Sequence, residues 1–207
     1  MGAKVKKADS FDELRQDAKL VIDDKALFTD GNTIINFEIL DTPLGKMLAC
    51  ATKDGICMLE FIDRRAFVTE LKDLKRMLRA TIEPGTNKHL KQVEKELNEY
   101  FEKKRKKFDV ALITSGTDFQ NAVWKKLLDI PYGETRSYKQ QSIALGNLGA
   151  IRAVGTANGA NRISIIVPCH RVIGEDGNLT GYGGGLKRKR WLLDFESGNL
   201  SLFGEEE

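Results

Sequence analysis

The residues that could do chemistry lie together where an apolar segment ends. Residues 165–167 are all β-branched and bring the chain towards the interior, and Pro168 then removes a backbone donor and ends regular structure. Cys169 and His170 follow directly. A thiol reacts as its thiolate, so its ordinary pKa of about 8.5 must fall before it is a good nucleophile at neutral pH. A neighbouring histidine can take that proton, either directly or through a water molecule.

A cysteine beside a histidine is by itself open to other interpretations. A buried cysteine is often no more than a small hydrophobic residue. A cysteine protease brings cysteine, histidine and an orienting group together from separate parts of the chain, so the adjacent Cys169 and His170 do not fit it. A thiol redox protein would have a resolving cysteine nearby, whereas Cys50 and Cys57 are remote in sequence. A reactive nucleophile and a packed structural thiol therefore both stay open on these two residues alone.

The composition sets limits on the fold and on the partners. A chain of 207 residues with 41% hydrophobic residues is long enough for one large domain or two small ones with a real core. The formal net charge is only +3, which barely argues for a nucleic-acid partner. Basic residues are nevertheless clustered at 103–107 and at 187–190. Each cluster is either a solvated face or a contact to phosphate.

The cysteine pattern bears on metals and on the cellular compartment. The sequence has no pair of cysteines separated by two residues, so we expect no structural zinc and no other metal. An odd cysteine count without a signal peptide indicates a reducing, intracellular compartment. No apolar run approaches the roughly 20 residues of a membrane span, so no membrane association is expected.

The N-terminal part of the sequence predicts a flexible tail and a small α/β domain. Residues 1–31 are polar and charged, which is typical of a loosely attached tail. Residues 32–115 form the domain, which carries no chemical motif of its own and is expected to support its neighbour. An Asp-Gly turn at Asp54 indicates a hairpin. The expected elements are strands at 33–40, 46–52 and 56–62, helices at 67–78 and 90–101, and a strand at 108–113.

Residues 116–207 predict a mainly helical domain. Thr117 and Ser137 each precede a glutamine by three residues, a capping-box pattern that opens helices at 118–129 and 138–145. A helix at 148–158 follows a tight glycine-containing turn, so these last two helices are expected to form a helix-turn-helix. Beyond the Cys169 segment, the sequence predicts a turn at 175–178, interpreted as a wing, and a final helix at 186–195.

The segment Pro168-Cys169-His170-Arg171-Val172 closely resembles the active-site signature of the O6-alkylguanine-DNA alkyltransferases, which repair DNA and are consumed in the reaction. These residues match the signature without a departure. The resemblance is strong from about residue 117 to 196 and weak from about residue 33 to 112. It implies an α/β N-terminal domain followed by a C-terminal α-helical winged helix-turn-helix domain.

The resemblance also implies the roles of the catalytic residues. Glu196 orients and charges His170, and His170 draws the proton from Cys169 through a water molecule. The thiolate attacks the alkyl carbon on guanine O6 while Tyr182, or a nearby donor, protonates guanine N3. Asn161 hydrogen-bonds the backbone near the cysteine, although the residue alone could equally form a simple loop turn. The product is a stable thioether, so each molecule reacts once and needs no cofactor.

The partner that the resemblance implies is double-stranded DNA carrying O6-alkylguanine or O4-alkylthymine, with the second helix of the helix-turn-helix in the minor groove. A side chain at the position of Arg152 fills the gap left by the flipped base. Tyr138 crowds the phosphate of the flipped nucleotide. Without the resemblance, the small residues of this helix would suit core packing equally well. The expected DNA contacts are Tyr138, Lys139, Gln140, Ala150, Arg152, Ala153 and Gly155.

The glycine-rich stretch around Tyr182 is expected to line the guanine pocket. So many glycines cannot form a helix, and their backbone could line a pocket or form a flexible linker. Gly184 stands where many bacterial relatives carry a tryptophan, and Asp118 replaces a common proline. The expected pocket residues are Val172, Gly181, Gly183, Gly184 and Gly185.

The resemblance further implies a monomer in the cytoplasm, associated with the nucleoid, or in the nucleus of a eukaryote. The alternative from a binding class is a non-catalytic alkyltransferase-like protein or a transcription-regulatory helix-turn-helix protein. Alkyltransferase-like proteins lack the cysteine, and Cys169 is present here, which favours the enzyme.

Overall fold

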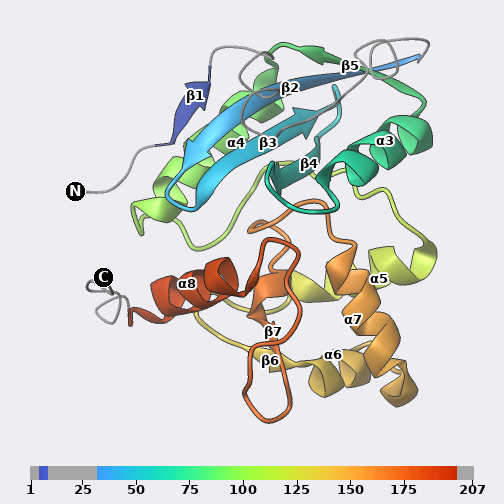
Figure 1. The fold of residues 1–207 in the computed structure, drawn as a ribbon, viewed down its shortest axis with the longest axis vertical. Coiled ribbons are helices and arrows are strands. Elements are labelled where there is room, and N and C mark those ends of the chain that lie inside the picture. The colour runs from blue at the N-terminus through green and yellow to red at the C-terminus, as the bar shows by residue number, and fades with distance from the viewer. Residues whose placement is uncertain (1–4, 9–31, 200–207) are drawn as a thin grey trace. The chain divides into compact units, whose positions relative to one another are not determined.

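The computed structural model describes residues 5–8 and 32–199, which form two compact units (Figure 1). Unit 1 takes in the described residues up to Ser115 together with Arg162–Ser164. Unit 2 takes in Gly116–Asn161 and the described chain from Ile165 onward. The flexible tail expected at 1–31 lies outside the described residues, apart from residues 5–8. None of the helices that the structure describes is long and apolar enough to span a bilayer.

Unit 1 is built on a five-stranded sheet. The expected meander is present as β2 (Thr33–Thr42), β3 (Gly45–Ala51) and β4 (Ile56–Phe61). Two strands that the sequence did not predict also pair with β2. They are β1 (Lys6–Ala8), which is antiparallel to it, and β5 (Ala80–Pro84), which is parallel to it.

Two helices cover this sheet where the apolar spacing predicted them. Helix α3 (Phe67–Leu78) contacts β4 and β5, and α4 (Lys88–Phe101) contacts β2, β3 and β4. Side chains alternate along a strand, so β3 is buried on both faces. Cys50 belongs to the core cluster that includes α3 residues, whereas the neighbouring Ala49 points the opposite way. Cys50 and Cys57 are buried packing residues in this core.

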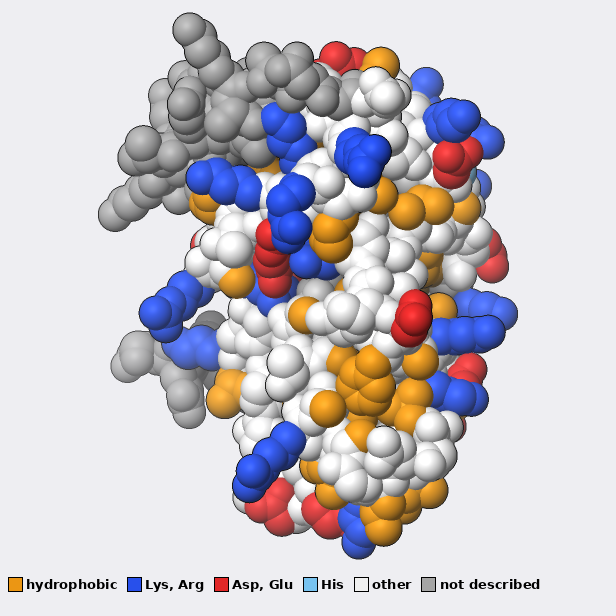
Figure 2. Space-filling view, turned by 90° about the vertical axis from the view of Figure 1, so that its right-hand side faces the viewer, with side chains coloured by type: hydrophobic (Ala, Val, Ile, Leu, Met, Phe, Trp, Pro, Cys, Tyr) orange, Lys and Arg blue, Asp and Glu red, His pale blue; other side chains and the backbone are white. Residues whose placement is uncertain are grey.

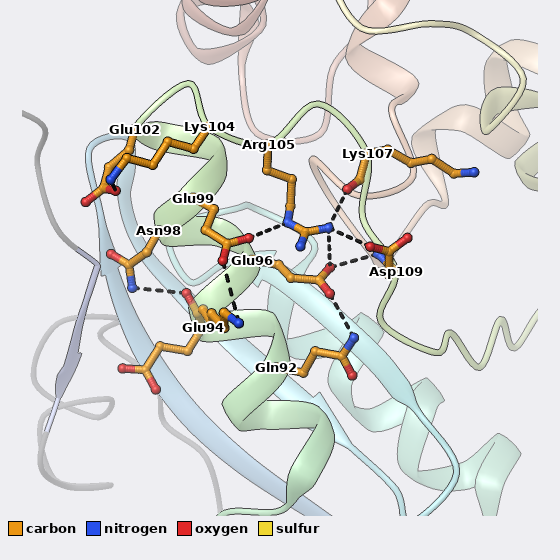
Figure 3. Close-up of polar contacts among 11 residues, drawn as sticks. Gln92, Glu94, Glu96, Asn98, Glu99, Glu102, Lys104, Arg105, Lys107 and Asp109 are labelled. Carbon is orange, nitrogen blue, oxygen red and sulfur yellow. Dashed lines mark hydrogen bonds and ion pairs between the residues drawn. The ribbon is translucent and has the colours of Figure 1, made fainter.

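The strand expected at 108–113 is wrong. Only Leu112 bridges another strand residue, Ile56. The N–H group of Asp109 instead donates to Glu96 Oε2 at 2.9 Å (Figure 3), and that of Val110 donates to the same oxygen at 3.3 Å. A carboxylate from α4 therefore satisfies backbone groups that a strand would pair with a neighbouring strand.

The basic run at 103–107 is part of the same network. Arg105 donates to Glu99 Oε2 at 2.7 Å and to Asp109 Oδ2 at 2.8 Å, and Lys104 pairs with Glu102 at 2.7 Å (Figure 3). A phosphate contact through Arg105 would have to compete with these carboxylates. The contacts favour a structural role for Arg105, which fixes the chain that leaves α4.

Unit 2 is mainly helical, and both predicted capping boxes are present. The Thr117 and Ser137 hydroxyls accept hydrogen bonds from the backbone of Gln120 and Gln140, whose side chains bond back. These boxes open α5 (Asp118–Leu127) and α6 (Tyr138–Ala144). The remaining elements are η1 (Leu148–Ala150), α7 (Ile151–Gly159), η2 (Cys169–Arg171), α8 (Leu186–Ser197) and the short parallel strands β6 (Arg136–Ser137) and β7 (Val172–Ile173).

The helix-turn-helix of α6 and α7 packs on α5. The indole nitrogen of buried Trp124 on α5 donates to the carbonyl of Ala157 on α7 at 2.8 Å, which ties the two helices together. The expected turn after β7 is present, because Gly174 N donates to Asn178 O at 2.9 Å. No strand follows this turn within residues 174–199, so the segment interpreted as a wing consists of the predicted turn alone.

Candidate active site

Cys169 begins η2 at the end of a tight buried turn. Residues 165–167 are buried, as expected from their apolar character, but they form a turn and not a strand. Ile165 adopts a φ of +72°, a left-handed conformation that a β-branched residue rarely takes. Such strain persists only where the surrounding structure fixes it, and it is often found at functional sites. The thiol is therefore presented by a constrained piece of backbone, with the cysteine only 6% exposed.

Asn161 reaches this turn from the end of α7. Its Nδ2 donates to Val167 O at 2.9 Å and to the Cys169 sulfur at 3.2 Å. The expected hydrogen bond to the backbone near the cysteine is thus present, together with a direct contact to the sulfur. A donor at this position favours a negatively charged sulfur over a neutral thiol.

His170 is fully buried beside Glu196 of α8. The expected contact between them is present, with His170 Nε2 lying 2.9 Å from Glu196 Oε1. A carboxylate accepts only, so this contact assigns the proton to Nε2 and makes Nδ1 the basic nitrogen of the neutral ring. Nδ1 has no hydrogen-bond partner among the described residues. Burial lowers the pKa of His170, which keeps it neutral near pH 7, while Glu196 opposes that shift.

Arg171 completes this buried cluster and was missed in the sequence analysis as a site residue. Its Nε and Nη2 donate to the two oxygens of Glu196 at 2.8 and 3.0 Å, and its Nη1 donates to Ile130 O at 2.6 Å. Burial opposes ionisation of Glu196, but the hydrogen bond from His170 and the hydrogen bonds and charge of Arg171 outweigh it and hold its pKa below the usual range. The carboxylate therefore stays charged at neutral pH.

Lys189 is the second site residue that the sequence analysis did not identify. It lies in the basic run at 187–190, yet it is fully buried instead of facing phosphate. Its Nζ donates to Val172 O and Thr180 O, each at 2.6 Å, and to Gly181 O at 3.4 Å. Burial lowers the pKa of Lys189 to about 8. The ammonium group ties the segment after the cysteine to the start of the glycine-rich stretch.

Two tyrosines lie close to these groups. Tyr138 Oη donates to Thr180 O at 3.2 Å, and its ring centroid lies 5.8 Å from Lys189 Nζ. The Tyr182 ring meets the His170 ring edge-on, with centroids 6.5 Å apart. Burial raises the pKa of Tyr138, and the hydrogen bond to Thr180 opposes that shift.

The glycine-rich stretch has the backbone that only glycine adopts readily. Gly181 and Gly185 have φ values of +44° and +89°. Gly184 is buried, whereas Gly183 is exposed. The Lys189 ammonium group donates to the carbonyl oxygens of Val172 and Gly181, so the same side chain holds two of the expected pocket residues. The assignment of these glycines to a substrate pocket stays a prediction.

The expected DNA contacts on α7 include an exposed set. Arg152 and Ala153 are exposed, and Gly155 is half-buried. A Cβ at Gly155 would lie 3.7 Å from the Tyr138 ring, so this glycine brings α7 close to that tyrosine. Ala150, at the end of η1, is buried, and its assignment as a DNA contact stays a prediction.

The other expected DNA contacts are partly engaged within the protein. The Gln140 carbonyl caps α6, and Lys139 Nζ lies 3.7 Å from Glu175 Oε1. On the face shown in Figure 2, basic side chains are scattered among acidic ones and form no continuous stripe.

Comparison with known proteins identifies the family. A family model described as "6-O-methylguanine DNA methyltransferase, ribonuclease-like domain" matches residues 35–114. A second model, "6-O-methylguanine DNA methyltransferase, DNA binding domain", matches residues 118–198. The chain belongs to this methyltransferase family. The family and the two-part fold class expected from the Pro168–Val172 signature are confirmed.

Individual relatives agree with this assignment. A methylated-DNA–protein-cysteine methyltransferase of Methanosarcina barkeri is 43% identical over 164 residues, which are 79% of this chain and 98% of that protein. One of Mycobacterium bovis is 59% identical over 112 residues, which are 52% of this chain and 68% of that protein. A crystal structure of Mycobacterium tuberculosis OGT in complex with DNA has a TM-score of 0.68 and 42% identity, covering 83% of this chain and 99% of that one.

Proposed function

We propose that this protein repairs DNA by transferring the alkyl group of O6-alkylguanine to the sulfur of Cys169. The observation that carries the proposal is the arrangement around that sulfur. Asn161 donates to it, and the adjacent His170 is kept neutral by burial and oriented by a charged Glu196. Family membership supports the same reaction, since curated relatives are named methylated-DNA–protein-cysteine methyltransferases.

The first step of the proposed reaction is the transfer of the Cys169 proton to His170. His170 Nδ1 is the basic nitrogen, because Nε2 donates to Glu196. In the proposed relay, a water molecule passes the Cys169 proton to Nδ1, and Glu196 stabilises the imidazolium that results. Arg171 keeps Glu196 from taking that proton itself, because it holds the carboxylate in its charged form.

The transfer is a displacement at the alkyl carbon. The sulfur–carbon bond forms as the carbon–O6 bond breaks, and the electron pair of that bond goes to the guanine ring. A proton on N3 then makes the leaving group a neutral guanine. Tyr182 is the proposed donor of that proton, with Tyr138 as the nearby alternative. The product is a thioether, which no group of the site can hydrolyse, so each molecule reacts once.

A base inside a duplex hides its O6 atom, so the proposed substrate must be flipped out. Extrusion costs a few kcal/mol. We propose that α7 enters the minor groove and that the exposed Arg152 fills the gap left by the base. O4-alkylthymine as a second substrate, action as a monomer, and localisation with the chromosome in the cytoplasm or nucleus stay predictions of the same proposal.

The test is intact-mass analysis after incubation with duplex DNA that contains O6-methylguanine. One methyl group per protein should appear, and peptide mapping should place it on Cys169. Cys50 and Cys57 should stay unmodified because burial raises both thiol pKa values, that of Cys57 to about 12. Cys169→Ala should lose transfer and keep DNA binding. Several methyl groups removed per protein molecule would contradict the proposal.

A further inference from the structure

The chain returns to unit 1 for three residues, Arg162–Ser164, directly before the active-site turn. There it lies along β4 as a short parallel segment. Leu59 N donates to Arg162 O, and Ser164 N donates to Leu59 O, both at 2.8 Å. Asn161 precedes this segment and Ile165 follows it, and both belong to unit 2. Unit 1 therefore holds residues 162–164, the piece of backbone that joins Asn161 to Ile165.

A buried carboxylate of unit 1 fixes the end of that segment. Glu60 on β4 is fully buried, and its Oε2 accepts from Ser164 Oγ at 2.8 Å and from Arg64 Nη1 at 2.5 Å. Its Oε1 accepts from Phe61 N at 2.9 Å. Arg64 Nη2 also pairs with Glu70 at 2.8 Å, which limits the movement of the guanidinium group. We call Glu60, Arg64 and Ser164 the Glu60 clamp.

A second hydrogen bond joins the two places where the chain passes between unit 1 and unit 2. Arg162 Nη1 donates to Ser115 O at 2.8 Å, and Ser115 is the last residue of unit 1 before Gly116 opens unit 2. The chain thus leaves unit 1 at Ser115 and at Ser164, and side chains within unit 1 hold both points. Replacing a buried ion pair by well-packed hydrophobic residues is often neutral or stabilising. A buried ion pair is therefore weak evidence for stability, and the clamp is interpreted by the position that it gives to Ser164.

We infer that Glu60 and Arg64 are positioning residues for the Cys169 thiol, acting through Ser164. Holding residues 162–164 fixes the start of the turn whose left-handed Ile165 leads to Cys169. It also fixes the chain end that follows Asn161, the residue whose amide contacts the sulfur. A looser segment would widen the range of distances between the Asn161 amide and the sulfur, and the thiolate would lose a donor for part of the time.

This inference rests on the proposed function for its rate measurement, but its main test does not need alkylguanine. The test is the rate of Cys169 modification by iodoacetamide as a function of pH, read by peptide mass. Ser164→Ala removes the hydroxyl that reaches Glu60, whereas Ser164→Thr keeps it. The loss of one hydrogen bond to a charged carboxylate corresponds to about a 10–100-fold effect. Ser164→Ala should raise the pH midpoint and slow transfer from O6-benzylguanine by about that factor, and Ser164→Thr should stay close to wild type.

A matched control variant distinguishes an effect on the position of Cys169 from an effect on the stability of unit 1. Glu96→Gln alters another buried carboxylate of unit 1, which holds backbone N–H groups far from Ser164 in sequence (Figure 3). Glu60→Gln should shift the pH midpoint, and Glu96→Gln should lower stability without shifting it. A wild-type pH profile in Ser164→Ala, or equal shifts in both glutamine variants, would overturn the inference. If the wild-type protein takes no alkyl group from DNA while the iodoacetamide shift persists, the proposed function fails and the clamp stands.

Discussion

Replacing Glu196 with glutamine tests the proposed relay most directly. The carboxylate accepts from His170 Nε2 at 2.9 Å and from Arg171 Nε at 2.8 Å. Glutamine keeps the shape but removes the charge and presents an N–H group where only an acceptor serves. His170 then loses a charge-assisted hydrogen bond worth about 1.5–3 kcal/mol and becomes a weaker base. One pKa unit corresponds to about 1.36 kcal/mol, so the pKa of Cys169 should rise by about 1–2 units.

The assay for Glu196→Gln is inactivation by free O6-benzylguanine across a range of pH. The midpoint of the pH–rate profile should move upward, and below both midpoints the rate should fall by about 10–100-fold, in step with the thiolate fraction. Asp194→Asn, on the same helix, is the control and should leave the profile unchanged. An unchanged midpoint in Glu196→Gln would refute the relay and leave Glu196 with a structural role.

The same substitution has a separate effect on stability. Because the folded-state pKa of Glu196 is lowered, its contribution to the free energy of unfolding is present above the unfolded-state pKa of about 4.3 and is lost as pH falls towards the folded-state value. Removing one member of a buried pair costs about 3–5 kcal/mol. Urea unfolding should show this loss at pH 7.5 and a smaller difference from wild type below about pH 4.

Three further substitutions test other parts of the site. Arg152→Ala should slow repair in duplex DNA much more than reaction with the free base, and equal losses on both substrates would assign it to the fold. Gly184→Trp should slow inactivation by O6-benzylguanine, since an indole replaces a buried glycine; a wild type that resists the inhibitor yet repairs methylated DNA would contradict this. Burial lowers the pKa of Lys189 to about 8, so the wild type should gain stability relative to Lys189→Met between pH 8 and 10, as the buried ammonium loses its proton. Urea unfolding at both pH values measures this, and a constant difference between the two proteins would show that Lys189 is not perturbed.

Local signals in the sequence predicted local structure well. The capping boxes at Thr117 and Ser137 need only residues within one helical turn, and both helices begin where the pattern placed them. The segment at 108–113 has the composition of a strand, but the N–H groups of Asp109 and Val110 bond Glu96, more than ten residues earlier. Composition alone does not reveal such a partner. The short β5 was missed for a similar reason, since its partner strand begins at Thr33.

The candidate site likewise contains residues that the sequence revealed and residues that it did not. Cys169 and His170 could be found from their chemistry, and Glu196 from the family resemblance. Lys189 was expected only as part of a charge run, because burial of a charge depends on partners elsewhere in the chain. One local signal existed: Lys189, Leu192 and Glu196 share a helical spacing and are all buried. No comparable signal linked Ser164 to Glu60, which lies 104 residues earlier.

The position of Trp124, on α5 against the helix-turn-helix, has a practical consequence for fluorescence measurements. The chain has two tryptophans, and the other, Trp191, stacks on Phe195 of α8 in the same unit. Intrinsic tryptophan emission therefore originates only in unit 2, and a quencher or a bound duplex will be sensed there alone. Loosening of the sheet in unit 1 would be silent by fluorescence and visible by far-ultraviolet circular dichroism. A difference between the two optical signals during denaturation would thus show whether unit 2, which contains Cys169, unfolds later than unit 1.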